Sequence, residues 1–429
     1  MPAPKTVAIP MSQHIGAQAV PCVKIGDNVD KGQVIGIIES GLGAPVHASV
    51  SGTVIKIEEK SGTNGVIVKN VVIENDGESR IHPDIKPWGK PLADTTAEEI
   101  VEIVKNAGIS GMGGATFPTH AKISSALGKV DTIIVNCAEC EPFITANHRL
   151  LLEYPETVIG GLKILMHAFG LNEGIIAIED NKLDAAKVLV QTLGADTSVK
   201  VKIVKTKYPQ GDERQLIYAL TKKKLAAGRL PAEVGCCIFN AETCAAIHNA
   251  FTTGMPLVER VVTVDGDCIK NPGNVFTAIG TTYRDLIAFC GGLVRTPRKL
   301  ICGGPMMGAA QWDLTTPVTK GTSALLALSP DMEYNYEQES LCIRCGRCVR
   351  NCPMRLMPNY LASFSKRNML DLAEQFNILS CIECGSCSYN CPGHVSIVQR
   401  IRATKVKIND RKRAMQSSLE QSKINKEEK

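Results

Sequence analysis

The chain has 429 residues, 44% of them hydrophobic, and a formal net charge of +5, which is the composition of a globular protein with room for two or three domains. Aromatic residues make up only 4% of the chain, too few for the stacking platforms of a single-strand nucleic-acid binder, so no nucleic-acid partner is expected. No apolar run approaches the roughly 20 residues that span a bilayer, and the N-terminal residues lack the apolar core of a secretory signal.

The first predicted elements are short strands separated by glycine turns, between residues 20 and 58. The segment GDNVDKGQVIG at 26–36, followed by a second glycine-punctuated pair of strands, resembles the lipoyl and biotinyl carrier sandwich. Those carriers attach their cofactor to a lysine at a hairpin tip, whereas Leu42 occupies the corresponding place here. Residues 1–74 are therefore expected to form a lipoyl/biotinyl-like barrel-sandwich module without the attachment lysine, which serves structure or docking.

A linker and then a helix are predicted next. Residues 75–95 contain three prolines and several turn formers, which is typical of a linker. Thr95 and Thr96 are each followed three residues later by a glutamate, so either threonine can begin the helix with a capping box. Gly108 supplies the stop signal at the other end.

From residue 96 to residue 254 the chain alternates β-rich runs with helical patterns, which predicts an α/β domain with a largely parallel sheet. After it, a β-hairpin and a helix are predicted, which indicates a small β-grasp-like unit of the SLBB type over 255–330. The predicted strands of the α/β domain are 132–136, 174–179, 199–204 and 235–240, its helices include 183–193 and 213–223, and the later hairpin and helix are 256–280 and 281–292.

Eight of the 17 cysteines repeat the pattern C-x2-C-x2-C-x3-C followed by proline, in CIRCGRCVRNCP at 342–353 and in CIECGSCSYNCP at 381–392. Three thiolates at this spacing wrap one face of an iron–sulfur cluster, and in two-cluster ferredoxins the fourth cysteine ligates the other cluster. Two [4Fe–4S] clusters are therefore predicted. The first would be held by Cys342, Cys345, Cys348 and Cys391, and the second by Cys381, Cys384, Cys387 and Cys352. The alternative is a pair of structural zinc sites, which would require neither the third cysteine nor the Cys-Pro of each motif.

The cysteine region, residues 331–405, is predicted to be an α-helical two-cluster ferredoxin-like domain. The tail at 406–429 is basic and poor in apolar residues, which favours a solvated helix or disorder; the alternative is a basic strip that faces a partner or a membrane surface. The cysteine content favours a reducing compartment over a disulfide framework. Outside the two motifs, most cysteines are expected to be buried small hydrophobes, an expectation that Cys137 and Cys140 fit least because they lie beside acidic residues.

A glycine-rich loop, GISGMGGATFPTHAK at 108–122, follows the first predicted helix. It is not a Rossmann fingerprint, because no strand precedes it and the third glycine of G-x-G-x-x-G is missing. Its glycines still let backbone amides approach a phosphate or a flat ring closely. The residues alone leave two interpretations open, a ligand-binding loop and a plain turn.

Four segments, in order along the chain, are similar to the flavin-bearing, NADH-oxidising subunit of respiratory complex I. They are GMGGATFPTHAK at 111–122, NCAECEP at 136–142, YPQGDERQLI at 208–217 and FNAETCAAI at 239–247. Over about 20–405 the whole chain resembles the C subunit of the Rnf electron-transport complex, with GRLPAEVG, GGPMMG and the two cysteine motifs in that family's order. A cobalamin-reductase subunit shares this layout and is the alternative relative.

This resemblance implies that NADH gives a hydride to FMN and that the two clusters then carry single electrons to partner subunits. The residues that would face the FMN phosphate and ring are Gly111, Gly113, Gly114 and Lys122, with Asn136 and Asn240 at the polar edges of the flavin. Phe117 would stack on the adenine of NADH, Glu141 would bind its ribose hydroxyls, and Glu213 would lie near the nicotinamide as the catalytic residue. Glu139 and Gly211 complete the expected cofactor-binding set.

The loop also departs from the complex I pattern. Met112 stands where that family has arginine, Thr116 and His120 where it has glycines, and Ala138 where it has aspartate, so the flavin loop carries less charge here. The expected function is the NADH-oxidising, or reversibly NAD-reducing, subunit of an ion-translocating Rnf complex, held at the cytoplasmic face of the membrane by its partner subunits. The alternatives are a cobalamin-reductase-like protein and a non-catalytic electron-relay adaptor.

Overall fold

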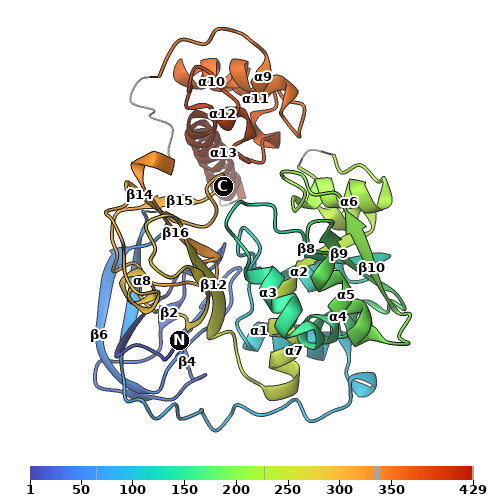
Figure 1. The fold of residues 1–429 in the computed structure, drawn as a ribbon, viewed down its shortest axis with the longest axis vertical. Coiled ribbons are helices and arrows are strands. Elements are labelled where there is room, and N and C mark those ends of the chain that lie inside the picture. Colours follow the sequence, from blue (N-terminus) through green and yellow to red (C-terminus); the bar gives the residue numbers. More distant parts are fainter. Residues whose placement is uncertain (64, 227, 333–338, 428–429) are drawn as a thin grey trace. The chain divides into compact units, whose positions relative to one another are not determined.

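A computed structural model describes residues 1–63, 65–226, 228–332 and 339–427. The chain divides into two compact units, the first formed by the residues up to Leu225 and from Leu230 to 332, and the second containing residues 339–427. Each unit is described by itself. In the first unit the chain builds four small β-sheets and the helices that pack against them (Figure 1).

The N-terminal part of the first unit is built from two antiparallel sheets. One sheet has the order β1 (Thr6–Pro10), β7 (Ile67–Asn75), β6 (Gly52–Ser61) and β3 (Asn28–Val29), and the other has the order β2 (Val20–Pro21), β4 (Val34–Ile37) and β5 (Val46–His47). Their apolar side chains share one buried core, which includes Ile9, Ile35, Val54 and Ile73. Leu42, expected at a hairpin tip, lies in the connection between β4 and β5.

The second part is an α/β layer with a four-stranded sheet in the order β10 (Val199–Val204), β9 (Gly174–Glu179), β8 (Thr132–Cys137) and β11 (Cys236–Asn240). Every neighbouring pair is parallel, which confirms the prediction from strand–helix alternation. Both faces are covered: Cys237 and Phe239 of β11 enter the larger core, while Cys236 and Ile238 enter a smaller one on the opposite face.

Several helices complete this layer. They are α1 (Ala97–Asn106), α2 (Thr119–Ala126), α3 (Ala146–Glu153), α4 (Pro155–Phe169), α5 (Leu183–Leu193), α6 (Glu213–Thr221) and α7 (Ala241–Thr253). Helix α1 begins at Thr96, whose hydroxyl accepts from the Glu99 amide while the Glu99 side chain accepts from the Thr96 amide. The capping box predicted from sequence therefore forms at the second of the two candidate threonines.

The third part of the first unit contains a five-stranded sheet in the order β13 (Gly273–Ala278), β12 (Glu259–Asp265), β16 (Ala324–Leu328), β14 (Lys299–Cys302) and β15 (Ala309–Gln311). The predicted hairpin is confirmed as the antiparallel pair β12–β13. Helix α8 (Tyr283–Phe289) begins at Thr282, whose hydroxyl accepts from the Asp285 amide, and it packs into the core of this sheet through Tyr283 and Leu286.

The second unit is helical around its two cysteine motifs. Its helices are α9 (Arg347–Arg350), α10 (Pro358–Lys366), α11 (Leu370–Gln375), α12 (Ser386–Tyr389) and α13 (Ile397–Glu427). Leu361, Ala373, Ile378 and Ile401 are among the side chains of its buried core. The tail is helical, because it belongs to α13, which continues to Glu427.

Candidate functional site

Two asparagines meet at the carboxyl edge of the parallel sheet, the edge where α/β proteins bind ligands. Asn136 lies beside Asn240, because the two residues are paired in register between β8 and β11. Asn136 Nδ2 donates to the Gly211 carbonyl at 2.8 Å, and its Oδ1 accepts from the Ala138 amide at 3.0 Å. Asn136 thereby holds two loops at this edge.

Asn240 contacts the glycine-rich loop and also caps a helix. Its Oδ1 accepts from the Glu242 amide at 2.9 Å at the start of α7. The loop passes over its side chain so closely that a Cβ at Gly113 would lie 2.8 Å from Asn240 Nδ2. Gly114, one residue further on, has open space at the same position. The loop backbone therefore rests on Asn240 at Gly113 and faces away from protein at Gly114.

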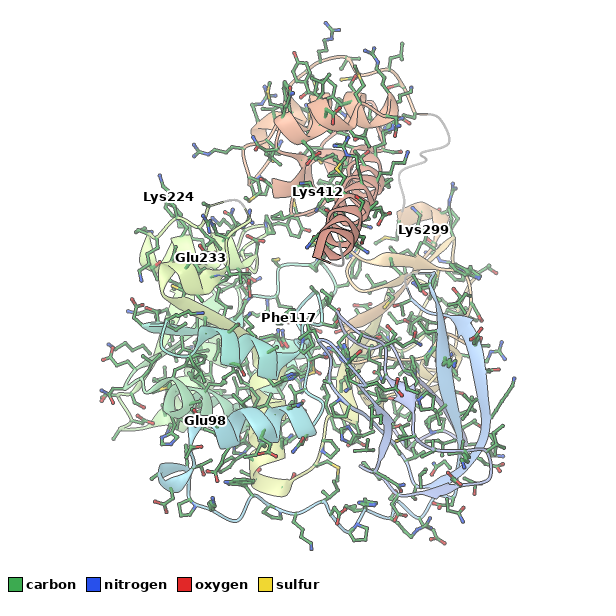
Figure 2. All side chains as sticks on the ribbon, turned by 180° about the vertical axis from the view of Figure 1, so that it is seen from behind. Glu98, Phe117, Lys224, Glu233, Lys299 and Lys412 are labelled. Carbon is green, nitrogen blue, oxygen red and sulfur yellow. The ribbon has the colours of Figure 1, made fainter. Side chains whose placement is uncertain are left out.

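The base of the same loop is closed by short backbone contacts. The Gly111 amide donates to the Phe117 carbonyl at 2.9 Å, and Ser110 forms a β-bridge with Pro118. Phe117 is 39% exposed (Figure 2), although it is a large apolar side chain. An exposed aromatic ring on a loop of this kind is available for stacking with a flat ligand.

Lys122 and Glu213, to which the resemblance assigns different ligand groups, contact each other directly. Lys122 Nζ lies 2.6 Å from Glu213 Oε1, and the two side chains are 28% and 43% exposed. The ammonium group also lies 5.5 Å from the centre of the Phe239 ring. Glu213 is the first residue of α6, whose N-terminus is capped by Asp212 through the amides of Arg214 and Gln215.

The two glutamates after β8 use their carboxylates within the fold. Both oxygens of Glu139 accept backbone amides at the start of α3, from Asn147 at 2.9 Å and from His148 at 3.2 Å. Glu141 Oε2 accepts from the Met306 amide at 3.0 Å, and Tyr208 donates its hydroxyl to Glu141 Oε1 at 3.3 Å. Burial raises the pKa of both carboxyls, and these hydrogen bonds act in the opposite direction.

Behind the loop lie two buried cations that the sequence analysis missed. Arg260 Nη2 contacts Glu242 Oε2 at 2.6 Å, and the guanidinium also donates to the Lys320 carbonyl. Lys320 Nζ donates to the Gly108 carbonyl at 2.6 Å and to the Pro45 carbonyl at 3.0 Å. Burial lowers the pKa of Lys320 to about 7. These side chains connect the start of the glycine-rich loop and the N-terminus of α7 to the five-stranded sheet.

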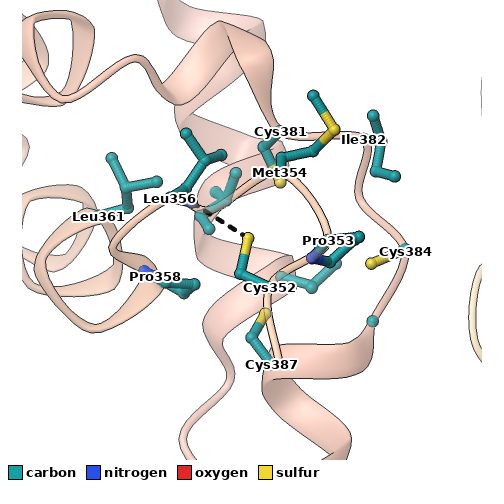
Figure 3. A pocket seen from close by; sticks show the side chains of 13 residues that line it. Cys352, Pro353, Met354, Leu356, Pro358, Leu361, Cys381, Ile382, Cys384 and Cys387 are labelled. Carbon is teal, nitrogen blue, oxygen red and sulfur yellow. Dashed lines mark hydrogen bonds between the residues drawn. The ribbon is translucent and has the colours of Figure 1, made fainter. Parts of the chain in front are cut away.

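In the second unit the cysteines form two groups, and each group combines three thiols of one motif with the last thiol of the other. Cys352 lines a pocket together with Cys381, Cys384 and Cys387 (Figure 3). A second pocket is lined by Cys342, Cys345, Cys348 and Cys391.

Backbone amides point at the sulfur atoms of the first of these pockets. The Leu356 amide donates to Cys352 Sγ at 3.3 Å, and the Glu383 amide donates to Cys381 Sγ at 3.4 Å. Burial, followed by the neighbouring thiols, raises the pKa of Cys387 to about 12. Each group holds a third cysteine and the Cys-Pro of a motif, which a structural zinc site would not require.

Of the nine cysteines outside the motifs, most are buried as expected: Cys137, Cys236, Cys237, Cys244, Cys268 and Cys290. Cys140 and Cys302 are partly buried, and the prediction is wrong for Cys22, which is exposed.

Four family models match the chain. The Nuo51 FMN-binding domain matches residues 104–249, and the 4Fe-4S dicluster domain matches residues 334–409. The RnfC barrel sandwich hybrid domain matches residues 1–78, and the SLBB domain matches residues 261–310. The chain is therefore a multidomain α/β protein that combines these four domain types.

Curated relatives cover nearly the whole chain. The C subunit of the Na(+)-translocating ferredoxin:NAD(+) oxidoreductase complex of Acetobacterium woodii is 47% identical over 406 residues, which are 94% of this chain and 91% of that protein. The C subunit of the proton-translocating complex of Clostridium ljungdahlii is 43% identical, over 94% of this chain and 88% of that protein. The C subunit of the ion-translocating oxidoreductase complex of Rhodobacter capsulatus is 39% identical, over 96% of this chain and 79% of that protein.

A solved structure of NAD+-reducing [NiFe]-hydrogenase in its H2-reduced state resembles the fold. Its TM-score is 0.50 with 17% identity, and the match covers 73% of this chain and 63% of the hydrogenase chain. At this identity the match describes the fold alone.

Proposed function

Because the chain belongs to the family of C subunits of ion-translocating ferredoxin:NAD+ oxidoreductase (Rnf) complexes, we propose that it exchanges electrons between NADH and the other subunits of such a complex. The protein is an oxidoreductase subunit with an FMN-binding domain and a 4Fe-4S dicluster domain. The observation that supports a nucleotide-redox role most strongly is the meeting of the glycine-rich loop, Asn136, Asn240 and the Lys122–Glu213 pair at one sheet edge.

The residues at this edge fit an FMN. When bound, FMN takes a hydride from NADH and passes electrons on singly. The loop from Gly111 to Gly114 offers backbone amides, and Gly113 lies so close to Asn240 that the loop leaves no room there for a side chain. Lys122 would supply a positive charge for the flavin phosphate or ring, while Asn136 and Asn240 would contact the polar edges of the flavin.

For NADH we propose Phe117 as the adenine stacker, Glu141 for the ribose hydroxyls and Glu213 near the nicotinamide. The exposure of Phe117 and the partial exposure of Glu213 support these roles. Glu141 already accepts two hydrogen bonds, so it would bind ribose with its remaining lone pairs. Gly211 and Glu139 would act indirectly. Gly211 holds the Asn136 side chain through its carbonyl, and Glu139 fixes the start of α3.

In the second unit we propose two [4Fe–4S] clusters with exchanged fourth ligands. The grouping of Cys352 with Cys381, Cys384 and Cys387 supports this exchange, as does the pocket that Cys391 shares with the first motif. We also propose the finer domain descriptions: a lipoyl-like N-terminal module lacking the attachment lysine and a β-grasp-like unit around β12–β13.

No helix in the described ranges combines the length and hydropathy that a membrane crossing requires. We propose that the protein is peripheral and is held at the cytoplasmic face by partner subunits. A cobalamin-reductase-like protein is not favoured, since the relatives at 39–47% identity are C subunits of the Rnf type. A non-catalytic adaptor is not favoured either, because an FMN-binding domain model matches residues 104–249, the region that contains the proposed flavin residues.

An oxygen-free NADH titration of the cluster-loaded protein tests the function. We expect prompt bleaching of flavin and cluster absorbance, and a Glu213→Gln variant should lower kcat more than it raises KM because the group would act near the transferred hydride. Dithionite serves as the control, since it reduces the clusters without the nucleotide site. Clusters that dithionite reduces and NADH does not would contradict the proposal.

A further inference from the structure

The two cysteine motifs hold their ligands at identical spacing but differ in exposure. Cys342 and Cys345 of the first motif are exposed, whereas Cys384 and Cys387 of the second motif are buried. Leu341 and Ile343, which flank Cys342, are 85% and 69% exposed although both are large apolar residues. The first motif therefore presents two of its cysteines, Cys342 and Cys345, and an apolar patch on the surface of the second unit, although its Cys348 is buried.

The charges of the two motifs also differ at equivalent positions. Arg344, Arg347 and Arg350 of the first motif correspond to Glu383, Ser386 and Tyr389 of the second. The second motif has the same cysteine spacing without any of these arginines, so the spacing does not require them. They are an addition to the first motif alone.

The positive charge extends beyond the motif. Between residues 340 and 370 the chain has six cations and no Asp or Glu. All six are exposed, and within the described part of the chain none has a carboxylate at ion-pair distance. They are Arg344, Arg347, Arg350, Arg355, Lys366 and Arg367. By contrast, Glu383 of the second motif is paired with Arg402 at 2.8 Å and with Lys405 at 2.5 Å.

We propose that the surface formed by Leu341, Ile343, Arg344, Arg347 and Arg350, named here the basic cluster face, docks an acidic redox partner protein. The partner would carry a one-electron centre beneath a surface that is acidic at its rim and apolar at its centre. Exposed arginines and an exposed apolar patch are the complement of such a surface. A lipid surface would match the charge but offers no electron acceptor.

This inference deepens the proposed function and rests on it, because the partner would receive the electrons that the chain takes from NADH. One electron crosses the basic cluster face in each transfer, with no bond made and no proton moved. Electron transfer weakens steeply with distance, so the motif with exposed cysteines is the place where a second protein approaches most closely. In the second motif Cys384 and Cys387 are buried and Cys381 and Cys391 are partly buried, so none of its cysteines is as exposed as Cys342 and Cys345.

The test uses the full-length, cluster-loaded protein reduced with dithionite, which bypasses NADH and the flavin. The probe is an acidic plant-type ferredoxin, and both its affinity and its rate of reduction are measured at low and high salt. An Arg344→Glu/Arg347→Glu double variant is compared with a Lys407→Glu/Arg413→Glu variant, which makes the same charge change on the exposed side of α13. We expect the first variant to lower affinity and rate by roughly 10-fold or more and the second to change them little.

Several results would overturn the proposal. Equal losses in both variants would show an effect of net charge alone. An unchanged ferredoxin affinity with a matching loss of binding to anionic phosphatidylserine vesicles would assign the face to a membrane. Slower cluster reduction by NADH, with transfer to ferredoxin unchanged, would assign the face to the flavin domain of the same chain. Iron and sulfide contents are measured for each variant, and Arg344→Gln/Arg347→Gln replaces the glutamate variant in all assays if clusters are lost.

The proposal and the proposed function fail in different ways. If NADH does not reduce the parent protein but the dithionite-reduced protein binds ferredoxin through the basic cluster face, the docking surface stands and the NADH role falls. An Ile343→Ser variant adds a second check, because it removes apolar area without changing charge. It should weaken ferredoxin binding at high salt as well as at low salt.

Discussion

Replacing Lys320 with methionine should change the pH dependence of stability in a direction that the structure fixes. The amine is buried and donates to the carbonyls of Gly108 and Pro45, and burial lowers its pKa to about 7 from an ordinary value of 10.5. Between these two pKa values the unfolded chain holds a proton that the folded chain lacks. The free energy of unfolding therefore rises with pH across this window, whereas below pH 7 both states are protonated and the burial penalty is constant.

The size of the effect follows from about 1.4 kcal/mol per pKa unit. Between pH 7 and pH 9 the parent protein should gain about 2 kcal/mol relative to Lys320→Met. Neighbouring histidines do not disturb the window, because burial lowers the pKa of His47 to about 3 and also lowers that of His14. Denaturant unfolding of both proteins at several pH values, at fixed salt, measures the difference. Parallel stability curves for the two proteins would refute the reasoning.

Three further outcomes are expected. Cys352→Ala should damage the cluster built by the second motif and leave the first largely intact, as measured by iron content and electron paramagnetic resonance; the opposite pattern would contradict the exchanged ligands. Gly113→Ala should weaken flavin binding several-fold, because its Cβ would press on Asn240, whereas Gly114→Ala, with open space at its Cβ, should bind flavin normally; equal flavin contents would argue against this loop pose. Glu141→Gln should raise the KM for NADH by roughly 10-fold, since hydrogen bonds to a charged carboxylate contribute about 1.5–3 kcal/mol, and an unchanged KM would place the ribose elsewhere.

Local patterns in the sequence were enough to predict the elements that carry the site. The four strands of the parallel sheet were visible as short β-rich runs, and the start of α1 was visible in the capping box of Thr96. The meeting of Asn136 with Asn240 was not visible, because it depends on β8 and β11 being neighbours although they are about a hundred residues apart. Strand order is a property of the whole sheet, which periodicity along the chain does not encode.

The supports behind the site could not be predicted for the same reason. Arg260 and Lys320 stand in β-rich segments where a cation is normally solvated, and only the contacts with Glu242 and Gly108 make their burial tolerable. Glu141 was predicted as a site residue, but its bonds to Met306 and Tyr208 join segments far apart in the chain. Sequence reasoning named candidate groups with chemistry and missed the groups that hold them in place.

In the duplicated cysteine motif, the distinction between the ligand residues and the residues around them matters for function. Identical spacing gives both motifs the same capacity to hold a cluster, and Cys352 and Cys391 each line the pocket of the other motif. Their difference comes from the residues between the cysteines. Arg344 in the first loop is exposed, whereas Glu383 at the equivalent position pairs with Arg402 and Lys405 of α13. The duplicated pattern thus carries opposite charges in its two loops, and under the proposed docking it is the first loop, with Cys342 and Cys345 exposed, that a partner protein would approach.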